Sequence, residues 1–189
     1  MLAAVWIGFV LAIVALGIWA SRATTMPGDV AVSQWVQAFR ASWLDSLMKA
    51  VAFAGDPLPA AVILAIVAGI VALAGRRFEA ALIGGATVLA FGVRTLLKEA
   101  VQRPRPAADL VEIVEEADGY SFPSGHVLHY AVFLGLLLIV LPMVVRPGFG
   151  LNLARALLVG LIVLCGVSRV YLGVHWFSDV VAGYAIATA

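Results

Sequence analysis

Residues 123–145 read PSGHVLHYAVFLGLLLIVLPMVV, an unbroken stretch without Asp, Glu, Lys or Arg. A transmembrane helix needs about 20 mostly apolar residues, because the hydrocarbon core is about 30 Å thick and a helix rises about 1.5 Å per residue. The stretch is therefore long enough to cross a membrane as one helix. Similar stretches precede and follow it, so this segment indicates the architecture of the whole chain.

The composition of the chain is that of an integral membrane protein. Of its 189 residues, 63% are hydrophobic and 12% are charged, and the mean hydropathy is +1.07. A soluble domain has about 25% charged residues, and a soluble fold of this size has too little interior to hide so much apolar surface. The net charge of +1 offers no basic field for nucleic acid, and the lone Cys165 excludes a disulfide framework and a cysteine-based zinc site. Soluble enzymes, nucleic-acid binders and disordered chains are thereby excluded.

The hydrophobic pattern predicts an all-α fold, a polytopic membrane helix bundle with about six transmembrane helices in one domain, 1–189. The predicted spans are 2–20, 58–75, 78–97, 123–145, 151–172 and 175–189. The first is interpreted as a retained span, because a signal peptide would have a basic leader and a shorter apolar run. The last is short, so we expect the chain to continue beyond Ala189. Asp56 and Pro57 are expected to cap the second span.

The segment 33–55, between the first two spans, has a different pattern. Its apolar residues recur at steps of three and four, and its polar residues occupy the other faces, as in an amphipathic helix. Such a helix, which here includes Trp35 and Trp43, is typical of the headgroup layer of a membrane. Packing on the protein's own surface is the alternative.

The distribution of charge gives an expected orientation. The tight turns at 75–78 and 146–150 carry Arg76, Arg77 and Arg146, which favours the cytoplasmic side for them. All three histidines then lie at the opposite, outer end of the spans. Ionisable groups at membrane depth are costly, so their gathering at one end indicates a functional site.

Three segments supply the candidate site. His175 and Asp179 are four residues apart, so on a helix the carboxylate can accept the imidazole Nδ1–H and leave Nε2 free as a nucleophile or base. Simple capping of a helix end by this pair is the alternative. Ser124 and Gly125 open a helix whose free N–H groups suit an anion, and His126 follows them.

Basic residues complete the set: Lys98, Arg105 and Arg169. Lys98 and Arg105 could simply anchor a span end in the headgroup layer. Together, however, three fixed cations, a helix N-terminus and two histidines suit cleavage of a phosphate ester. The phosphate needs charge neutralisation, the phosphorus needs a nucleophile, and the leaving oxygen needs a proton.

These segments, in this order, resemble the signature of the type 2 phosphatidic acid phosphatase superfamily, in its membrane lipid phosphate phosphatase branch. The family pattern is Lys-x6-Arg-Pro, then Pro-Ser-Gly-His, then Ser-Arg-x5-His-x3-Asp. This sequence satisfies every fixed position, with the residues Lys98, Arg105, Pro106, Pro123, Ser124, Gly125, His126, Ser168, Arg169, His175 and Asp179.

The resemblance implies a role for each residue. His175 would attack phosphorus and become a phosphohistidine, Asp179 would orient it, and His126 would protonate the leaving group and later activate water. The phosphoryl oxygens would be held by Lys98, Arg105, Ser124, Gly125 and Arg169. No metal and no other cofactor is expected. In bacterial membrane relatives the site opens to the outer or periplasmic face of the inner cell membrane.

The resulting hypothesis is a multi-pass membrane phosphatase acting on a lipid phosphate or diphosphate, of the undecaprenyl diphosphate, phosphatidylglycerol phosphate or phosphatidic acid class. Its expected partners are the lipid substrate and the bilayer, with no nucleic acid and no obligatory protein partner. Two alternatives stay open: a lipid phosphotransferase on the same scaffold, and a non-catalytic lipid-binding or transport protein.

Residues outside the signature are assigned by their surroundings. Arg103 is expected to be a solvated loop residue rather than a contact for a second phosphate. Arg94, one turn before Lys98, either lines the pocket or reaches toward the headgroups. His129 is expected to be packed or interfacial. The acidic residues of 112–118 are expected to be solvated.

Overall fold

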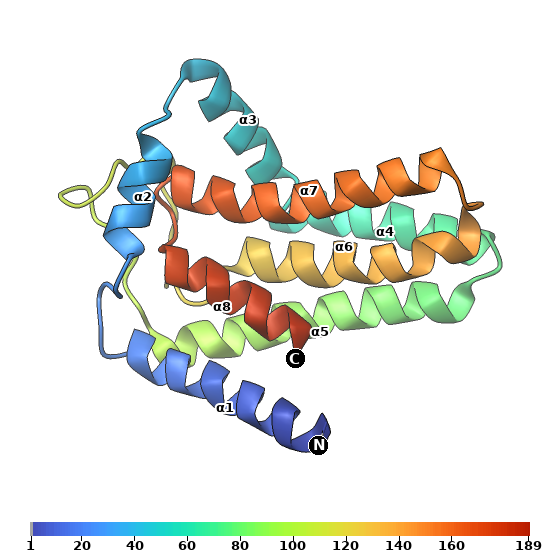
Figure 1. Ribbon diagram of the computed structural model, residues 1–189, viewed down its shortest axis with the longest axis horizontal. Helices are drawn as coiled ribbons and strands as arrows, with labels where there is room; N and C mark the ends of the chain where they lie inside the picture. Colours follow the sequence, from blue (N-terminus) through green and yellow to red (C-terminus); the bar gives the residue numbers. More distant parts are fainter. Residues whose placement is uncertain (1) are drawn as a thin grey trace.

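The computed structural model describes residues 2–189, with side chains from Trp6 onward, and these residues form eight α-helices and no β-strand (Figure 1). The helices are α1 (Leu2–Ala20), α2 (Asp29–Gln37), α3 (Ser42–Phe53), α4 (Pro57–Leu73), α5 (Arg77–Val101), α6 (Gly125–Val144), α7 (Phe149–Tyr171) and α8 (Phe177–Thr188). The predicted all-α fold is confirmed.

Helix α6 lies at the centre of the bundle. It packs against α5, α7 and α8, while α4 packs on α5 and α1 packs on α5 and α8. Ile83, Val127 and Cys165, from three different helices, are completely buried in the core. A central helix that is apolar on all sides has no polar stripe to present to water, which is why α6 takes this place.

The outer surface of the bundle is strongly apolar. Leu73 is 91% exposed and Phe149 is 83% exposed, and large apolar side chains cover the outer faces of α4, α5 and α7 as well. Soluble monomers do not expose apolar patches of this extent. This surface fits the acyl chains of a bilayer, in agreement with the membrane protein predicted from composition.

Within the part of the chain that the structure describes, three helices are each long and apolar enough to cross a membrane: α5, α6 and α7. Helices α3 and α4 pass the same test as a pair, although they meet at a bend of 63°. Helices lie at all six predicted positions, but α8 has 12 residues, or about 18 Å of helix. Six full crossings therefore stay a prediction.

The predicted single amphipathic helix over 33–55 is wrong, because the chain breaks between α2 and α3. Both helices pack on α7, and α2 also contacts α8. The side-chain amide of Gln37, at the end of α2, donates to the carbonyls of Glu112 and Tyr171, while α3 buries Met48 and Val51. These contacts support packing on the protein's own surface. The exposed side chains of Trp35 and Trp43, at 65% and 68%, also suit the headgroup layer.

One end of the bundle gathers the polar segments, on the left in Figure 1. Helix α2, the loop from 102 to 124, the beginnings of α6 and α8 and the ends of α5 and α7 meet there (Figure 1). The opposite end holds the short turns after α4 and α6. Helix α5 continues to Val101, beyond the predicted end at 97, so that Lys98 lies in its last turn. All three segments of the signature therefore reach the same end.

Candidate active site

A cavity of about 640 Å³ opens at this end of the bundle. Six of the eight predicted site residues line it: Lys98, Arg105, Gly125, His126, Arg169 and His175. They come from α5, α6, α7 and the two loops beside them, and are separated in sequence by up to 77 positions. The remaining two, Ser124 and Asp179, are completely buried behind the wall of the cavity.

The His175–Asp179 pair forms, although not along one helix as predicted. His175 lies before α8, Trp176 is the N-cap, and Asp179 is in the first turn. The distance from His175 Nδ1 to Asp179 Oδ2 is 3.6 Å, which is an ion-pair distance rather than a hydrogen bond. The same carboxylate oxygen accepts hydrogen bonds from the Trp176 N–H, at 2.9 Å, and from the hydroxyl of Ser121. Asp179 therefore caps α8 and also faces the histidine.

Burial controls the charge of His175. The residue is 3% exposed, and this burial lowers the pKa of its imidazole to about 4. Asp179 opposes the shift but is outweighed. The ring is therefore neutral at physiological pH, as a nucleophile must be.

His126 has a partner that the motif did not indicate. It lies in the first turn of α6, and its Nε2 is 3.2 Å from Oδ1 of Asp56. Asp56 is the N-cap residue of α4, as predicted, but its side chain makes no capping hydrogen bond. Gly55 permits this approach, because a Cβ there would collide with the His126 ring and lie 3.0 Å from Tyr130.

Arg105 is fixed by backbone carbonyls. It donates to the carbonyl oxygens of Asp118, Gly119 and Val174, the last at 2.7 Å. Because Val174 directly precedes His175, the guanidinium is held beside the predicted nucleophile. Lys98 donates to the carbonyl of Tyr120 in the same loop.

Arg169 is 2% exposed and projects from the last turn of α7. Its Nη1 is 3.8 Å from Glu115, and its Nη2 is buried with no hydrogen-bond partner among the described residues. A buried unpaired donor is costly, so a free Nη2 on the cavity wall suits an anion. Glu115 was expected to be only solvated, and this contact with Arg169 corrects that expectation.

The helix N-terminus is a smaller anion site than predicted. The backbone N–H of Ser124 donates to the carbonyl of Asp179 at 3.1 Å and is therefore not free. The Ser124 hydroxyl is buried without a hydrogen-bond partner among the described residues. Gly125, by contrast, lies on the cavity wall.

Arg103 was expected to be a solvated loop residue, and this expectation is wrong. Its side chain is completely buried, with Nη2 2.6 Å from Asp29 and Nη1 2.6 Å from Asp179. Asp29 also accepts hydrogen bonds from the N–H and hydroxyl groups of Ser178. A buried arginine must be paired, and the two carboxylates meet that need. Arg103 thus joins α2 to the residue that faces His175.

Two other residues left open by the sequence are now placed. Arg94 lines the cavity, in agreement with the first of its two expected placements. His129 is packed, as expected, with its ring stacked on Phe133 at 5.7 Å between centroids. Among the residues that the structure describes, no three His, Cys, Asp or Glu side chains converge closely enough to hold a metal ion.

Comparison with known proteins agrees with this geometry. The family model of the PAP2 superfamily matches residues 79–189. Phosphatidylglycerophosphatase B of Bacillus subtilis (strain 168) is 32% identical over 170 residues, covering 84% of this chain and 77% of that protein.

Two solved structures share the fold. A transmembrane PAP2 type phosphatidylglycerolphosphate phosphatase from Bacillus subtilis superposes with a TM-score of 0.77 at 23% identity, covering 94% of this chain and 89% of the other. LpxE of Aquifex aeolicus superposes with a TM-score of 0.67 at 22% identity, over 86% and 91% of the two chains. Together, the family match, the membrane fold and the cavity show that the chain belongs to the PAP2 superfamily, among its membrane phosphatases.

Proposed function

We propose that this protein removes phosphate from a lipid phosphate or diphosphate through a phosphohistidine formed on His175, without a metal ion. One observation carries the proposal: two histidines and three signature cations line a single cavity at one end of an apolar bundle. Each step of the reaction has a residue in that cavity suited to it.

His175 is suited to attack the phosphorus. Its Nδ1 faces Asp179 at 3.6 Å, so Nε2 is the nitrogen available to the substrate. The neutral ring donates its Nε2 electron pair to phosphorus, and the bond from phosphorus to the leaving oxygen breaks. Asp179 stabilises the positive charge that the ring gains during this step.

His126 is suited to handle the protons. An alcohol leaves poorly as an alkoxide, so a donor beside the leaving oxygen is needed, and the hydrolysis of the phosphohistidine needs a base for water. His126 is the second histidine on the cavity wall. Asp56, at 3.2 Å from its Nε2, orients the ring. In the proposed step the imidazolium donates its Nδ1 proton to the leaving oxygen, and the neutral ring later takes a proton from the attacking water at the same nitrogen.

The charge of the transferred phosphoryl group requires neutralisation, which Lys98, Arg105 and Arg169 supply. The carbonyl contacts of Arg105 preset its position, so little reorganisation is needed when the phosphate enters. These three cations do the electrostatic work that a metal ion does in other phosphatases.

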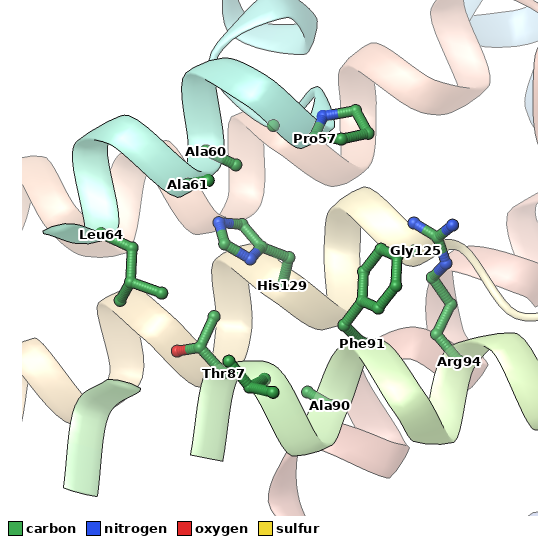
Figure 2. Close-up of a pocket in the computed structure, with 12 residues that line it drawn as sticks. Pro57, Ala60, Ala61, Leu64, Thr87, Ala90, Phe91, Arg94, Gly125 and His129 are labelled. Carbon is green, nitrogen blue, oxygen red and sulfur yellow. The ribbon is translucent and has the colours of Figure 1, made fainter. Parts of the chain in front are cut away.

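The lipid part of the substrate has an apolar pocket next to the phosphate cavity (Figure 2). This pocket, of about 280 Å³, lies between α4, α5 and α6, and Leu64, Val88 and Phe91 are on its wall. Pro57, Arg94 and Gly125 belong to both cavities. A chain in the pocket would therefore continue directly from a phosphate in the cavity.

We place the site on the outer side of the cell membrane. The short turns at the far end of the bundle carry Arg76 and Arg77, after α4, and Arg146, after α6. Positive residues in short loops favour the cytoplasmic side, which leaves the cavity on the outer side.

The test is the release of inorganic phosphate by the purified protein in detergent with EDTA present. The substrates tested are phosphatidylglycerol phosphate, undecaprenyl diphosphate and phosphatidic acid. The name of the Bacillus subtilis relative favours the first of these. His175→Ala is the inactive control. We expect release by the wild type alone, and an acid-labile phosphoenzyme on wild type that His175→Ala lacks.

The other outcomes separate the alternatives. Phosphate that appears on an added lipid acceptor instead of in solution identifies a phosphotransferase. Equal release by wild type and His175→Ala contradicts the phosphohistidine. No turnover with any substrate or acceptor identifies a non-catalytic protein, and loss of activity in EDTA contradicts independence from metal.

A further inference from the structure

Arg94 occupies the boundary between the phosphate cavity and the apolar pocket. It projects from α5, and Figure 2 shows its side chain beside Phe91 and the start of α6 at Gly125. It is not part of the family signature as found in this sequence. It nevertheless brings a fourth positive charge to the cavity wall.

The side chain of Arg94 lies across the first turn of α6. A Cβ at position 125 would collide with its Cδ and lie 3.0 Å from its Nη1. Gly125 therefore makes room for the arginine, next to His126. Because His126 is the proposed proton donor to the leaving group, Arg94 is on the leaving-group side of the cavity.

Arg105 marks the opposite side, since it is bound to the carbonyl before His175. The two arginines thus have different positions relative to the reacting phosphorus. Arg105 is beside the predicted nucleophile, and Arg94 lies where the phosphate cavity meets the apolar pocket.

Arg94 also has free donors. Its Nε is buried with no hydrogen-bond partner among the described residues. Its one polar interaction is with the face of the Phe91 ring, with 4.6 Å from its Cζ to the ring centroid. An unpaired guanidinium this close to the lipid-facing surface is costly, so an anionic ligand is expected at this point.

We propose that Arg94 binds a second phosphorus group, one that lies between the scissile phosphate and the lipid chain. This inference rests on the proposed function and names its substrate class: lipid diphosphates, and lipids with a phosphodiester at the corresponding place. A monophosphate such as phosphatidic acid has no group to meet Arg94. Arg103 does not bind a second phosphate, because its guanidinium is buried between two carboxylates.

The chemistry of a diphosphate fits this placement. His175 attacks the terminal phosphorus, the bond to the bridging oxygen breaks, and its electron pair stays on that oxygen. The leaving group is then a lipid monophosphate, which departs with additional negative charge rather than as an alcohol. Arg94 neutralises that charge, and water later releases inorganic phosphate from His175.

The test compares farnesyl diphosphate with farnesyl monophosphate, which share one chain. Wild type, Arg94→Gln, Arg94→Lys and the exposed control Arg22→Gln are assayed on both. We expect Arg94→Gln to lower kcat/KM for the diphosphate about 30- to 100-fold, in the range of a charged hydrogen bond, and to change the monophosphate value less than about threefold. Arg94→Lys should recover part of the loss, and Arg22→Gln should match the wild type.

A binding measurement separates failure of this inference from failure of the proposed function. Thermal shifts are recorded with the non-hydrolysable methylene analogue of farnesyl diphosphate and with farnesyl phosphonate. Selective weakening of the diphosphate analogue by Arg94→Gln supports the inference even if no substrate is turned over. Equal losses on both ligands, or no loss on either, overturn it, because Arg94 would then serve the scissile phosphate or only the fold.

Discussion

Arg103 and Asp179 form a completely buried ion pair, with 2.6 Å between Nη1 and Oδ1, and Asp179 is in turn the carboxylate that faces His175. The second nitrogen of the same guanidinium pairs with Asp29 of α2, also at 2.6 Å. The proposed nucleophile is therefore supported from behind by a chain of three charged side chains. We therefore expect Arg103 and Asp29 to act through Asp179, as positioning residues.

Substitution of Arg103 should damage both stability and catalysis. Arg103→Gln leaves two buried carboxylates unpaired, and breaking a buried ion pair costs about 3–5 kcal/mol. We expect lower thermal stability in detergent, measured against Arg22→Gln. The milder Asp29→Asn keeps Arg103 and Asp179 paired, so it should fold and lower kcat more than it raises KM. An unchanged kcat in folded Asp29→Asn would show that the network serves only the fold.

Asp56 is predicted to matter through His126. Asp56→Asn removes the negative charge 3.2 Å from the imidazole and weakens the orientation of the ring. We expect kcat to fall roughly 10-fold for a substrate that leaves as an alcohol, and much less for p-nitrophenyl phosphate, whose leaving group needs no proton. Asp109→Asn, at an exposed loop position, is the matched control. Equal losses on both substrates would contradict a role in proton transfer.

Gly55 provides a steric test of the same contact. In Gly55→Ala the new methyl group would collide with the rigid imidazole of His126 and press on Tyr130, so the ring must move. We expect at least a 10-fold loss of kcat, since small displacements of a catalytic group have large effects. Gly69→Ala, in the middle of α4 with open space at its Cβ position, should behave like the wild type. If both variants retain full activity, the position of His126 is not critical.

The pKa of His175 sets an expected dependence on pH. Burial lowers this pKa to about 4, whereas an unfolded histidine titrates near 6.5. Between these values the unfolded chain binds more protons, so the folding stability due to His175 is lost as pH falls from about 6.5 to about 4. The melting temperature of His175→Gln should decline less steeply than that of the wild type over this interval. Parallel curves would show that the imidazole titrates normally.

The signature residues could be picked out in the sequence because their spacing within each segment is local, and six of the eight line one cavity, while their roles stay predictions. Lys98 and Arg105 lie on one helix end and its adjoining loop, and His175 directly precedes the helix whose first turn holds Asp179. The membrane bundle followed from the apolar runs alone. These features depend on residues that are close in sequence, so the spacing of residue types along the chain is enough to predict them.

The partners of those residues were missed because they come from distant segments. Asp29 is 74 positions from Arg103, and Asp56 is 70 positions from His126. Before the fold is known, a charged loop residue followed by a proline, as Arg103 is, is more reasonably assigned to solvent. The break between α2 and α3 was missed for a similar reason, since the packing partner of both helices is distant in sequence. Gln37 donates to the carbonyl of Tyr171, 134 positions away, and Met48 belongs to the same buried cluster as Tyr171.

The buried Arg103 also has a consequence for the synthesis of the protein. Its two pairs connect residues 74 and 76 positions apart, which brings an early helix and a late helix to the same guanidinium. A nascent chain whose α8 has not yet been translated lacks Asp179. Its Arg103 can then pair with Asp29 but not with the second carboxylate. The network of Asp29, Arg103 and Asp179 can therefore be completed only after α8 has joined the bundle, as a late event of membrane insertion.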